Sequence, residues 1–450
     1  MGLGGAFSTT YTTISGGVNT FSGNLARVGG AIFATRDITI SGGTNTFSGH
    51  NSAGVGGAIC SDGGLTISGG ENTFSGNTSS DKGGAINGIT TISGGTNTFT
   101  DNSAGGYGGA FRATFGFVWV DTVLFRATDG DFTFRGNKDY AGTANEKANA
   151  FHMNNDVIDN RFLILAAEAG QNVYFYDPVT SYSGSQNFTI DINPLSTDTG
   201  RVVFDGSYWY DKDPTREVDR HSAVYYDNAT VGYGELALKG NAIFGAANDV
   251  GSFTLGQKAL LSSDATTNEI RANSITMNGK VDIANGGILN LSAANGVYFD
   301  GILSIGLGTL AAPDLFGDML FSAFNDINAS GMNTGLNVFG GGFGLTFGTD
   351  ARVQLYGEDD FFASLYDGWS SEYNLTDFFS ASDVFGLENL LFDMSVFDSY
   401  SGFRYAWNDG TLLLSYSDPT AAPEPATLAI LGLGLAGLGL ARRRRRKTAK

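Results

Sequence analysis

Four closely spaced aspartates are the clearest candidates for catalysis in this chain: Asp205, Asp211, Asp213 and Asp219. A glycoside hydrolase needs two carboxylates about 5–9.5 Å apart, and a polysaccharide lyase needs a carboxylate cluster beside a basic side chain. Solvated acidic loops have the same composition. We therefore interpret the four aspartates as a solvated loop and predict no catalytic residue.

Metal ligands give an equally weak pattern. The run Glu358-Asp359-Asp360 lacks the alternating oxygen-ligand spacing of a calcium loop, so it is interpreted as a solvated turn. His50, His152 and His221 have no zinc-type spacing. No glycine-serine elbow or phosphate-binding loop is present. We predict that the protein has no cofactor and no metal site.

A short repeat dominates the first quarter of the chain. Thr-Ile-Ser-Gly-Gly recurs, and each copy runs through one variable residue into Asn-Thr-Phe. The isoleucines are Ile14, Ile40, Ile67 and Ile92, and the phenylalanines are Phe21, Phe47, Phe74 and Phe99. Their intervals of 25 to 27 residues are typical of a solenoid, propeller or array.

The composition of the repeat selects among these architectures. Its β-branched and aromatic residues suit a pleated, half-buried surface, and its glycines and asparagines suit turns. The predicted fold is all-β, a right-handed parallel β-helix in which each coil contributes three short strands. Identical residues would then stack between coils spaced about 4.8 Å apart. No coil can bury its apolar side alone, so neighbouring coils must stabilise one another.

A polar residue follows each phenylalanine by three positions. It is Asn24, Asn77 or Asn102 in the regular coils and Asn137 after Phe134, whereas His50 takes the place in the second coil. Such a row could bind a metal or a sugar. We favour an asparagine ladder that bonds turn backbone, because buried polar groups need partners.

Phe-x-x-Asn beside Gly-Gly-Ala-Ile resembles the passenger repeat of the polymorphic outer-membrane protein family of autotransporter-type adhesins. Weaker similarity continues to about residue 300. The resemblance implies a right-handed β-helix with adhesion or surface display. Members of that family end in a membrane β-barrel, whereas this chain ends in arginines and lysines. Transport through a self-encoded pore is therefore not expected.

The C-terminal tail combines three features in a fixed order. Pro423, Glu424 and Pro425 precede an uncharged segment, 426–441, which we predict to be an apolar helix. A basic block follows, with Arg442, Arg443, Arg444, Arg445 and Arg446. Sixteen helical residues span about 24 Å, and flanking arginines can extend to the headgroups. The basic block is expected to stay cytoplasmic and the preceding chain to lie outside.

This order is similar to the PEP-CTERM sorting signal of Gram-negative bacteria, which exosortase recognises. The resemblance implies recognition near Pro423–Pro425 and removal of the tail at the inner membrane. A plain C-terminal anchor is the alternative. Export also requires a signal peptide, which residues 1–25 lack. We expect a signal peptide and further coils upstream of Met1.

The charge of the chain argues against a nucleic-acid partner, and its cysteine content excludes an intrachain disulfide. The net charge is −19, and residues 1–441 carry −26 once the seven tail cations are excluded. Such an acidic surface repels nucleic acid. Cys60 is the one cysteine, so no intrachain disulfide can form, and we interpret it as a packing residue.

The predicted organisation has three parts. Residues 1–300 form the β-helix, with regular coils over 1–110 and less regular ones over 111–300. Residues 301–418 form a β-rich cap or a small separate unit. Residues 419–450 are a linker plus the sorting signal, with the apolar helix at 426–441 and the basic tail at 442–450.

The predicted function is that of an exported, non-enzymatic protein of the cell surface or extracellular matrix, with an adhesin-like stalk. Its expected partners are an exosortase-type enzyme, the membrane before processing, and a candidate surface polysaccharide. Two alternatives stay open: a carbohydrate-active β-helix enzyme and an autotransporter-type adhesin. Two or more carboxylates sharing an exposed groove with a cation would favour the enzyme, and an outer-membrane barrel would favour the autotransporter.

Overall fold

The computed structural model describes residues 2–88, 90–113, 122–153, 161–181, 188–213, 215, 221–224, 228–245, 251–284, 287–307, 335–339 and 345–357. Further along the chain it describes 370–374, 379–380, 384–385, 390–393, 401–408 and 411–417. The tail that carries the predicted sorting signal and apolar helix lies outside the described residues. Among the described residues, no helix combines the length and apolar composition needed to cross a bilayer.

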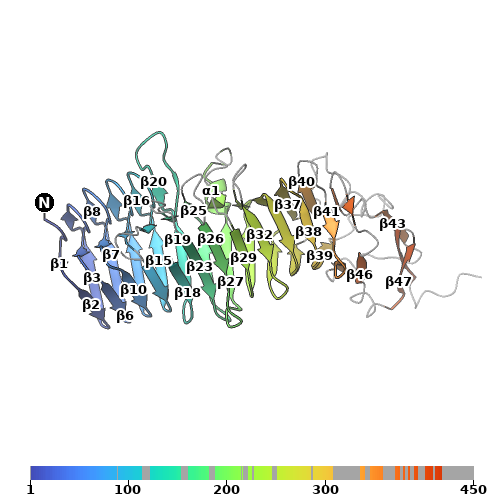
Figure 1. Ribbon diagram of the computed structural model, residues 1–450, viewed down its shortest axis with the longest axis horizontal. Helices are drawn as coiled ribbons and strands as arrows, with labels where there is room; N and C mark the ends of the chain where they lie inside the picture. The colour runs from blue at the N-terminus through green and yellow to red at the C-terminus, as the bar shows by residue number, and fades with distance from the viewer. Residues whose placement is uncertain are drawn as a thin grey trace, which may run out of the picture.

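The described chain is a parallel β-solenoid. Three parallel sheets of 13 strands each run along its long axis, and each strand pairs with its counterpart one coil further on (Figure 1). This arrangement confirms the predicted all-β class and parallel solenoid. The right hand of the coil stays a prediction.

Each long sheet is named here by its first strand. The β1 sheet contains β1 (Phe7–Thr9), β5 (Ile32–Ala34), β9 (Ile59–Ser61), β13 (Ile86–Asn87), β17 (Phe111–Ala113), β22 (Phe151–Met153), β25 (Val179–Ser181), β28 (His221–Val224), β31 (Ile243–Phe244), β34 (Thr267–Ala272), β37 (Ile288–Ala293), β40 (Gly335–Phe339) and β44 (Phe379–Ser380). The β2 sheet contains β2 (Thr12–Ser15), β6 (Ile38–Ser41), β10 (Leu65–Ser68), β14 (Thr90–Ser93), β18 (Thr122–Ala127), β23 (Arg161–Ala167), β26 (Phe188–Ile192), β29 (Asn228–Val231), β32 (Ser252–Leu255), β35 (Ser274–Met277), β38 (Val297–Phe299), β41 (Leu345–Phe347) and β45 (Val384–Phe385).

The β3 sheet completes the triangular coil. It contains β3 (Val18–Ser22), β7 (Thr44–Ser48), β11 (Glu71–Ser75), β15 (Thr96–Thr100), β19 (Phe132–Arg135), β24 (Asn172–Phe175), β27 (Arg201–Asp205), β30 (Glu235–Lys239), β33 (Leu260–Ser263), β36 (Lys280–Ile283), β39 (Ile302–Leu307), β42 (Arg352–Gly357) and β46 (Leu391–Asp393). The regular coils also have a fourth, two-residue strand, which the three-strand prediction missed. These form a six-stranded sheet of β4 (Leu25–Ala26), β8 (Asn51–Ser52), β12 (Thr78–Ser79), β16 (Ser103–Ala104), β20 (Lys138–Asp139) and β21 (Lys147–Ala148).

The repeat sets the register of the first coils. Strand pairing aligns Ile14 with Ile40, and the same column continues through Ile67 and Ile92. The phenylalanine rings stack face to face, with centroids 4.8 Å apart from Phe21 to Phe47 and from Phe47 to Phe74, and 4.9 Å apart from there to Phe99. Each strand alternates inward and outward side chains, so identical residues meet on every rung.

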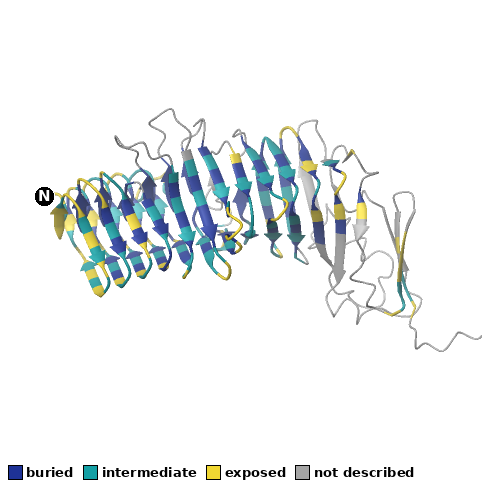
Figure 2. Cartoon of the chain, turned by 60° about the horizontal axis from the view of Figure 1, so that its bottom comes forward, coloured by how far each residue is buried: buried dark blue, intermediate teal, exposed yellow. Residues whose placement is uncertain are grey.

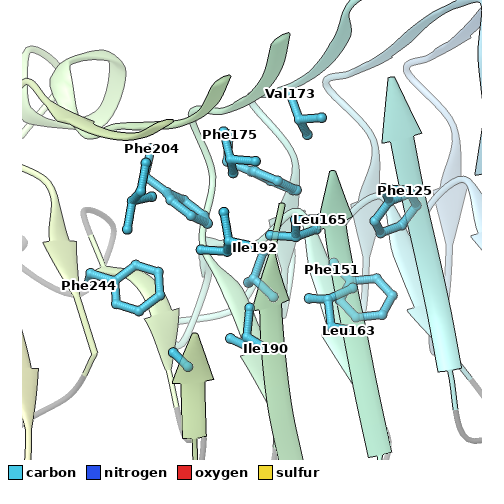
Figure 3. Close-up of a cluster of buried hydrophobic side chains, with 14 of the residues drawn as sticks. Phe125, Phe151, Leu163, Leu165, Val173, Phe175, Ile190, Ile192, Phe204 and Phe244 are labelled. Atoms are coloured by element: carbon cyan, nitrogen blue, oxygen red, sulfur yellow. The ribbon is translucent and has the colours of Figure 1, made fainter. Parts of the chain in front are cut away.

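The core is continuous along the axis. The inward columns are fully buried from the second coil onward, while Ile14 and Phe21 in the first coil are partly buried. In the middle coils the stack changes to larger and more varied aromatic and aliphatic side chains, such as Phe125, Phe151 and Phe244 (Figure 3). Figure 2 shows the alternation of buried and accessible residues as stripes across successive strands.

Glycine is required at the corner before each Gly-Gly-Ala strand. Gly29 has φ of 60°, in the left-handed region that other residues adopt at a cost. A Cβ on Gly30 would lie 2.0 Å from the Gly57 carbonyl oxygen. The first glycine of the repeated pair therefore permits the turn, and the second permits the close approach between coils.

The three long sheets continue beyond residue 300, through β42 and β46. A separate antiparallel sheet of β43 (Ser370–Asn374), β48 (Thr411–Tyr416) and β47 (Phe403–Asn408) follows in the C-terminal part. The division of the chain into domains stays a prediction.

Candidate functional site: polar ladders and the sorting tail

A ladder of buried polar side chains runs inside the corner between the β3 sheet and the short strands. In order along the axis, its members are Asn24, His50, Asn77, Asn102, Asn137 and Asp177. All except Asn24 are at most 2% exposed. The structure thus brings the predicted asparagines together in one column. It also adds Asp177, from the less regular coils, which the spacing did not indicate.

Each rung donates to the next. The Asn77 side-chain Nδ2 donates to Asn102 Oδ1 at 2.9 Å, and its backbone N–H donates to the same oxygen at 3.1 Å. Nδ2 also donates to the Phe47 carbonyl at 3.0 Å. The amide therefore satisfies the turn backbone of two coils at once, as buried polar groups require.

His50 fits the ladder through its ring nitrogen. The backbone N–H of Asn24 donates to His50 Nδ1 at 3.0 Å, and the backbone N–H of His50 donates to Asn77 Oδ1 at 3.1 Å. The ring also lies beside the Phe21 backbone. Burial lowers the pKa of His50 to about 4, and the Phe21 carbonyl only partly opposes this. The ring is therefore neutral at physiological pH, with Nδ1 as an acceptor.

A carboxylate ends the ladder. Asp177 accepts hydrogen bonds from the backbone N–H groups of Gly136 and Asn137, from Asn137 Nδ2, and from the indole Nε1 of Trp209 at 2.8 Å. Each residue of the ladder donates hydrogen bonds to the next one, so the last residue has only to accept them. An ionised carboxylate can only accept hydrogen bonds and therefore suits this position. Burial raises the pKa of Asp177 to about 6, while the four donors oppose that shift.

Trp209 comes from α1 (Ser207–Tyr210), a single helical turn. Its indole is 7% exposed and covers the end of the ladder near the last strands of the short six-stranded sheet. Outside it, Arg135 lies over the rings of Tyr176 and Tyr208, and Lys212 lies 3.9 Å from the Tyr208 ring centroid. Of these cation–π contacts, the one between Arg135 and Tyr208 joins α1 to the solenoid wall.

A second asparagine ladder lies on the β3 sheet. Asn19, Asn45 and Asn72 each donate from Nδ2 to the Oδ1 of the next asparagine at 2.8 to 2.9 Å, and Asn97 accepts the last of these bonds. All four Nδ2 groups also donate to a glycine carbonyl of their own corner. This second ladder was not predicted from the sequence. The signal was present in the Asn-Thr-Phe phrase. Its asparagine lies two residues before the phenylalanine, so both side chains must point to the inward face of the strand.

The candidate catalytic aspartates have local roles. Asp205 accepts from the backbone N–H of Ser207 at 2.9 Å, Asp213 accepts from Thr215 at 3.0 Å, and Asp211 caps α1. Asp219 and the Glu358-Asp359-Asp360 run lie outside the described residues.

The histidine and cysteine considered as possible site residues lie apart from one another in the fold. Buried His152 bonds Thr180 at 2.9 Å and stacks on Tyr107, and burial lowers its pKa to about 3. Cys60 is buried with its pKa raised by burial to about 12. Across the described ranges, no three His, Cys, Asp or Glu side chains gather as a metal site.

The fold and ladders define a repetitive β-solenoid, and comparison with known proteins adds its sequence relatives. Residues 421–446 match the PEP-CTERM protein-sorting motif, and residues 73–89 match the Chlamydia polymorphic membrane protein repeat. Both resemblances drawn from the sequence are confirmed. The sorting motif includes Pro423, Glu424, Pro425 and the arginine run, all outside the described residues.

One curated relative is the probable outer membrane protein pmp8 of Chlamydia pneumoniae. It is 29% identical over 134 residues, which cover 28% of this chain and 14% of that protein. No solved structure matches the chain. The motif and the repeat together point to an exported cell-surface protein, and the motif implies processing by an exosortase-type enzyme.

Proposed function

We propose that the solenoid is a non-catalytic, adhesin-like stalk in the extracellular matrix or at the surface of a Gram-negative bacterium. The observation that carries this proposal is the PEP-CTERM match at 421–446, which follows an extended repetitive solenoid. In this proposal the apolar segment 426–441 holds the chain transiently in the inner membrane until the exosortase removes it. A surface polysaccharide is the proposed extracellular partner.

The described side chains support a structural role for the solenoid interior. The buried asparagines of the ladder bond turn backbone and one another between coils, as Asn77 and Asn102 illustrate. The described aspartates of the candidate loop bond their own backbone. A repetitive scaffold of this kind provides length and a regular outer surface.

Sorting can be tested with the full chain, fused to a cleavable leader, in a Gram-negative host with and without its exosortase. We expect the processed protein at the surface or in the medium of the first host, with the arginine run absent by mass spectrometry. In the second host the intact chain should stay in the inner-membrane fraction.

Substitution of the motif supplies the matched comparison. Pro423→Ala combined with Pro425→Ala should retain the tail, whereas Pro419→Ala, just before the matched motif, should be processed normally. Processing that is the same with and without the enzyme would overturn the sorting proposal.

A further inference from the structure

The outer face of the first four coils of the β2 sheet carries hydroxyl groups at every outward position of its strands. Strand pairing aligns them in two columns of four, which we name the hydroxyl face: Thr13, Thr39, Thr66 and Thr91 in one, Ser15, Ser41, Ser68 and Ser93 in the other. The face ends in the fifth coil, where Leu124 and Arg126 take the two positions.

These hydroxyls are accessible and unused. Thr13, Thr66 and their serine neighbours are exposed, and the other members are half-buried. Within the described part of the chain, none of the eight side chains forms a hydrogen bond to another protein group. Each hydroxyl therefore keeps one donor and two acceptor sites for something outside the protein.

The hydroxyl face is also uncharged. The four strands that form it, β2, β6, β10 and β14, contain no Asp, Glu, Lys or Arg, although the whole chain has a net charge of −19. A charged ligand would find no counter-charge on it. The partner is thus a neutral one that forms hydrogen bonds.

The spacing of the hydroxyls is regular and stiff. The coil repeat is 4.8 to 4.9 Å, as the stacked phenylalanine rings record. Threonine and serine of one strand are two residues apart, or about 6.7 Å. Threonine has few χ1 rotamers, and the inward isoleucines of β6, β10 and β14 are buried, so little order is lost on binding.

A partner that uses such a two-dimensional array must itself be periodic. In a tetrahedral water lattice with O–H···O distances of about 2.75 Å, second-neighbour oxygens lie about 4.5 Å apart, and the axial repeat is about 7.4 Å. The mismatch along the solenoid reaches about 1 Å across four rungs, well under one hydrogen-bond length. Across the strand there is a single step, so the difference does not accumulate.

We propose that the hydroxyl face binds the surface of ice. The proposal concerns only the folded solenoid and does not depend on export or sorting. It assigns the first four coils to a recognition role, and it distinguishes them from the later coils, in which Arg126 and Asp191 stand on the same outer face of the β2 sheet.

The test measures freezing-point hysteresis and inhibition of ice recrystallisation with the purified full chain. We expect hysteresis and faceted crystals for the wild type. Thr66→Lys places a charged, long side chain in the middle of the face and should remove most of the effect. Asn228→Lys, at an exposed position of β29 in the same sheet, should leave it intact.

Unchanged circular dichroism and melting temperature of both variants would show that the solenoid is folded. Absence of hysteresis in the wild type, or hysteresis that survives Thr66→Lys, would overturn the proposal. Co-sedimentation with crystalline cellulose tests the alternative ligand, a neutral glycan. Binding to cellulose that depends on Thr66, without an effect on ice, would assign the face to a neutral glycan and also overturn it.

Discussion

At the scale of single residues, the ladder shows how a substitution is tolerated within a repeat. His50 replaces an asparagine because Nδ1 can accept the hydrogen bond that an asparagine Oδ1 accepts elsewhere. The substitution makes one rung titratable. Protonated Nδ1 becomes a donor facing the N–H of Asn24, so the folded state resists protonation.

The sign of the resulting pH dependence follows from the pKa of about 4 in the folded state against 6.5 in the unfolded state. Stability is highest above pH 6.5, falls as the unfolded chain binds the proton first, and levels off below about pH 4. We expect a contribution of about 1–3 kcal/mol after allowance for solvent screening.

His50→Asn is the measurement. Urea unfolding of both proteins from pH 7.5 to 4 should show a steeper loss of unfolding free energy for the wild type. Asp177 and His152 titrate in both proteins, so their contributions cancel when the two unfolding free energies are subtracted. Parallel pH profiles would contradict the proposed protonation of this rung.

At the scale of elements, the carboxylate of Asp177 connects α1 with the ladder that contains Asn77, Asn102 and Asn137. Asp177→Asn would turn one acceptor oxygen into an NH2 group facing two donors of Asn137. We expect a loss of about 2–4 kcal/mol in unfolding free energy, because buried donors are left unsatisfied. Asp213→Asn, in the neighbouring exposed loop, is the control and should change stability by less than about 0.5 kcal/mol.

Fluorescence of Trp209 provides a second reading of the same change. Its indole bonds Asp177 and is almost fully buried, so Asp177→Asn should shift its emission to longer wavelength as α1 loosens. An unshifted spectrum with unchanged stability would show that α1 is held by the cation–π contacts alone.

At the scale of the whole molecule, the solenoid is a one-dimensional stack in which each coil contacts its neighbours. Phe74 is fully buried between Phe47 and Phe99. Phe74→Ala should cost about 3–5 kcal/mol. Because interactions act between neighbours, the damage should decay within a few coils.

Hydrogen exchange with peptide resolution measures this decay. Protection should fall in β7, β11 and β15 and stay at the wild-type level in β33 to β36. Thr73→Ala, on the outer side of the same strand, is the matched control. Equal loss of protection along the whole chain would instead indicate a single cooperative unit.

Much of the first four coils could be predicted from the sequence. Ile14, Phe21 and their counterparts recur every 25 to 27 residues, and stacking one coil on the next places each beside its own copy. The asparagine row followed from the same spacing. The second ladder was equally encoded in the Asn-Thr-Phe phrase, because residues two apart in a strand face the same side.

Past about residue 112 the sequence by itself determined less, and the tertiary structure decided the rest. Arg126 meets Asp198 at a separation of 72 residues, and Trp209 reaches Asp177 over 32, through coils whose lengths differ. A repeat predicts contacts because one period equals one coil, so residues separated by one period lie side by side on neighbouring coils. Where coil length varies, that relation is lost, and only the path of the folded chain determines which side chains meet.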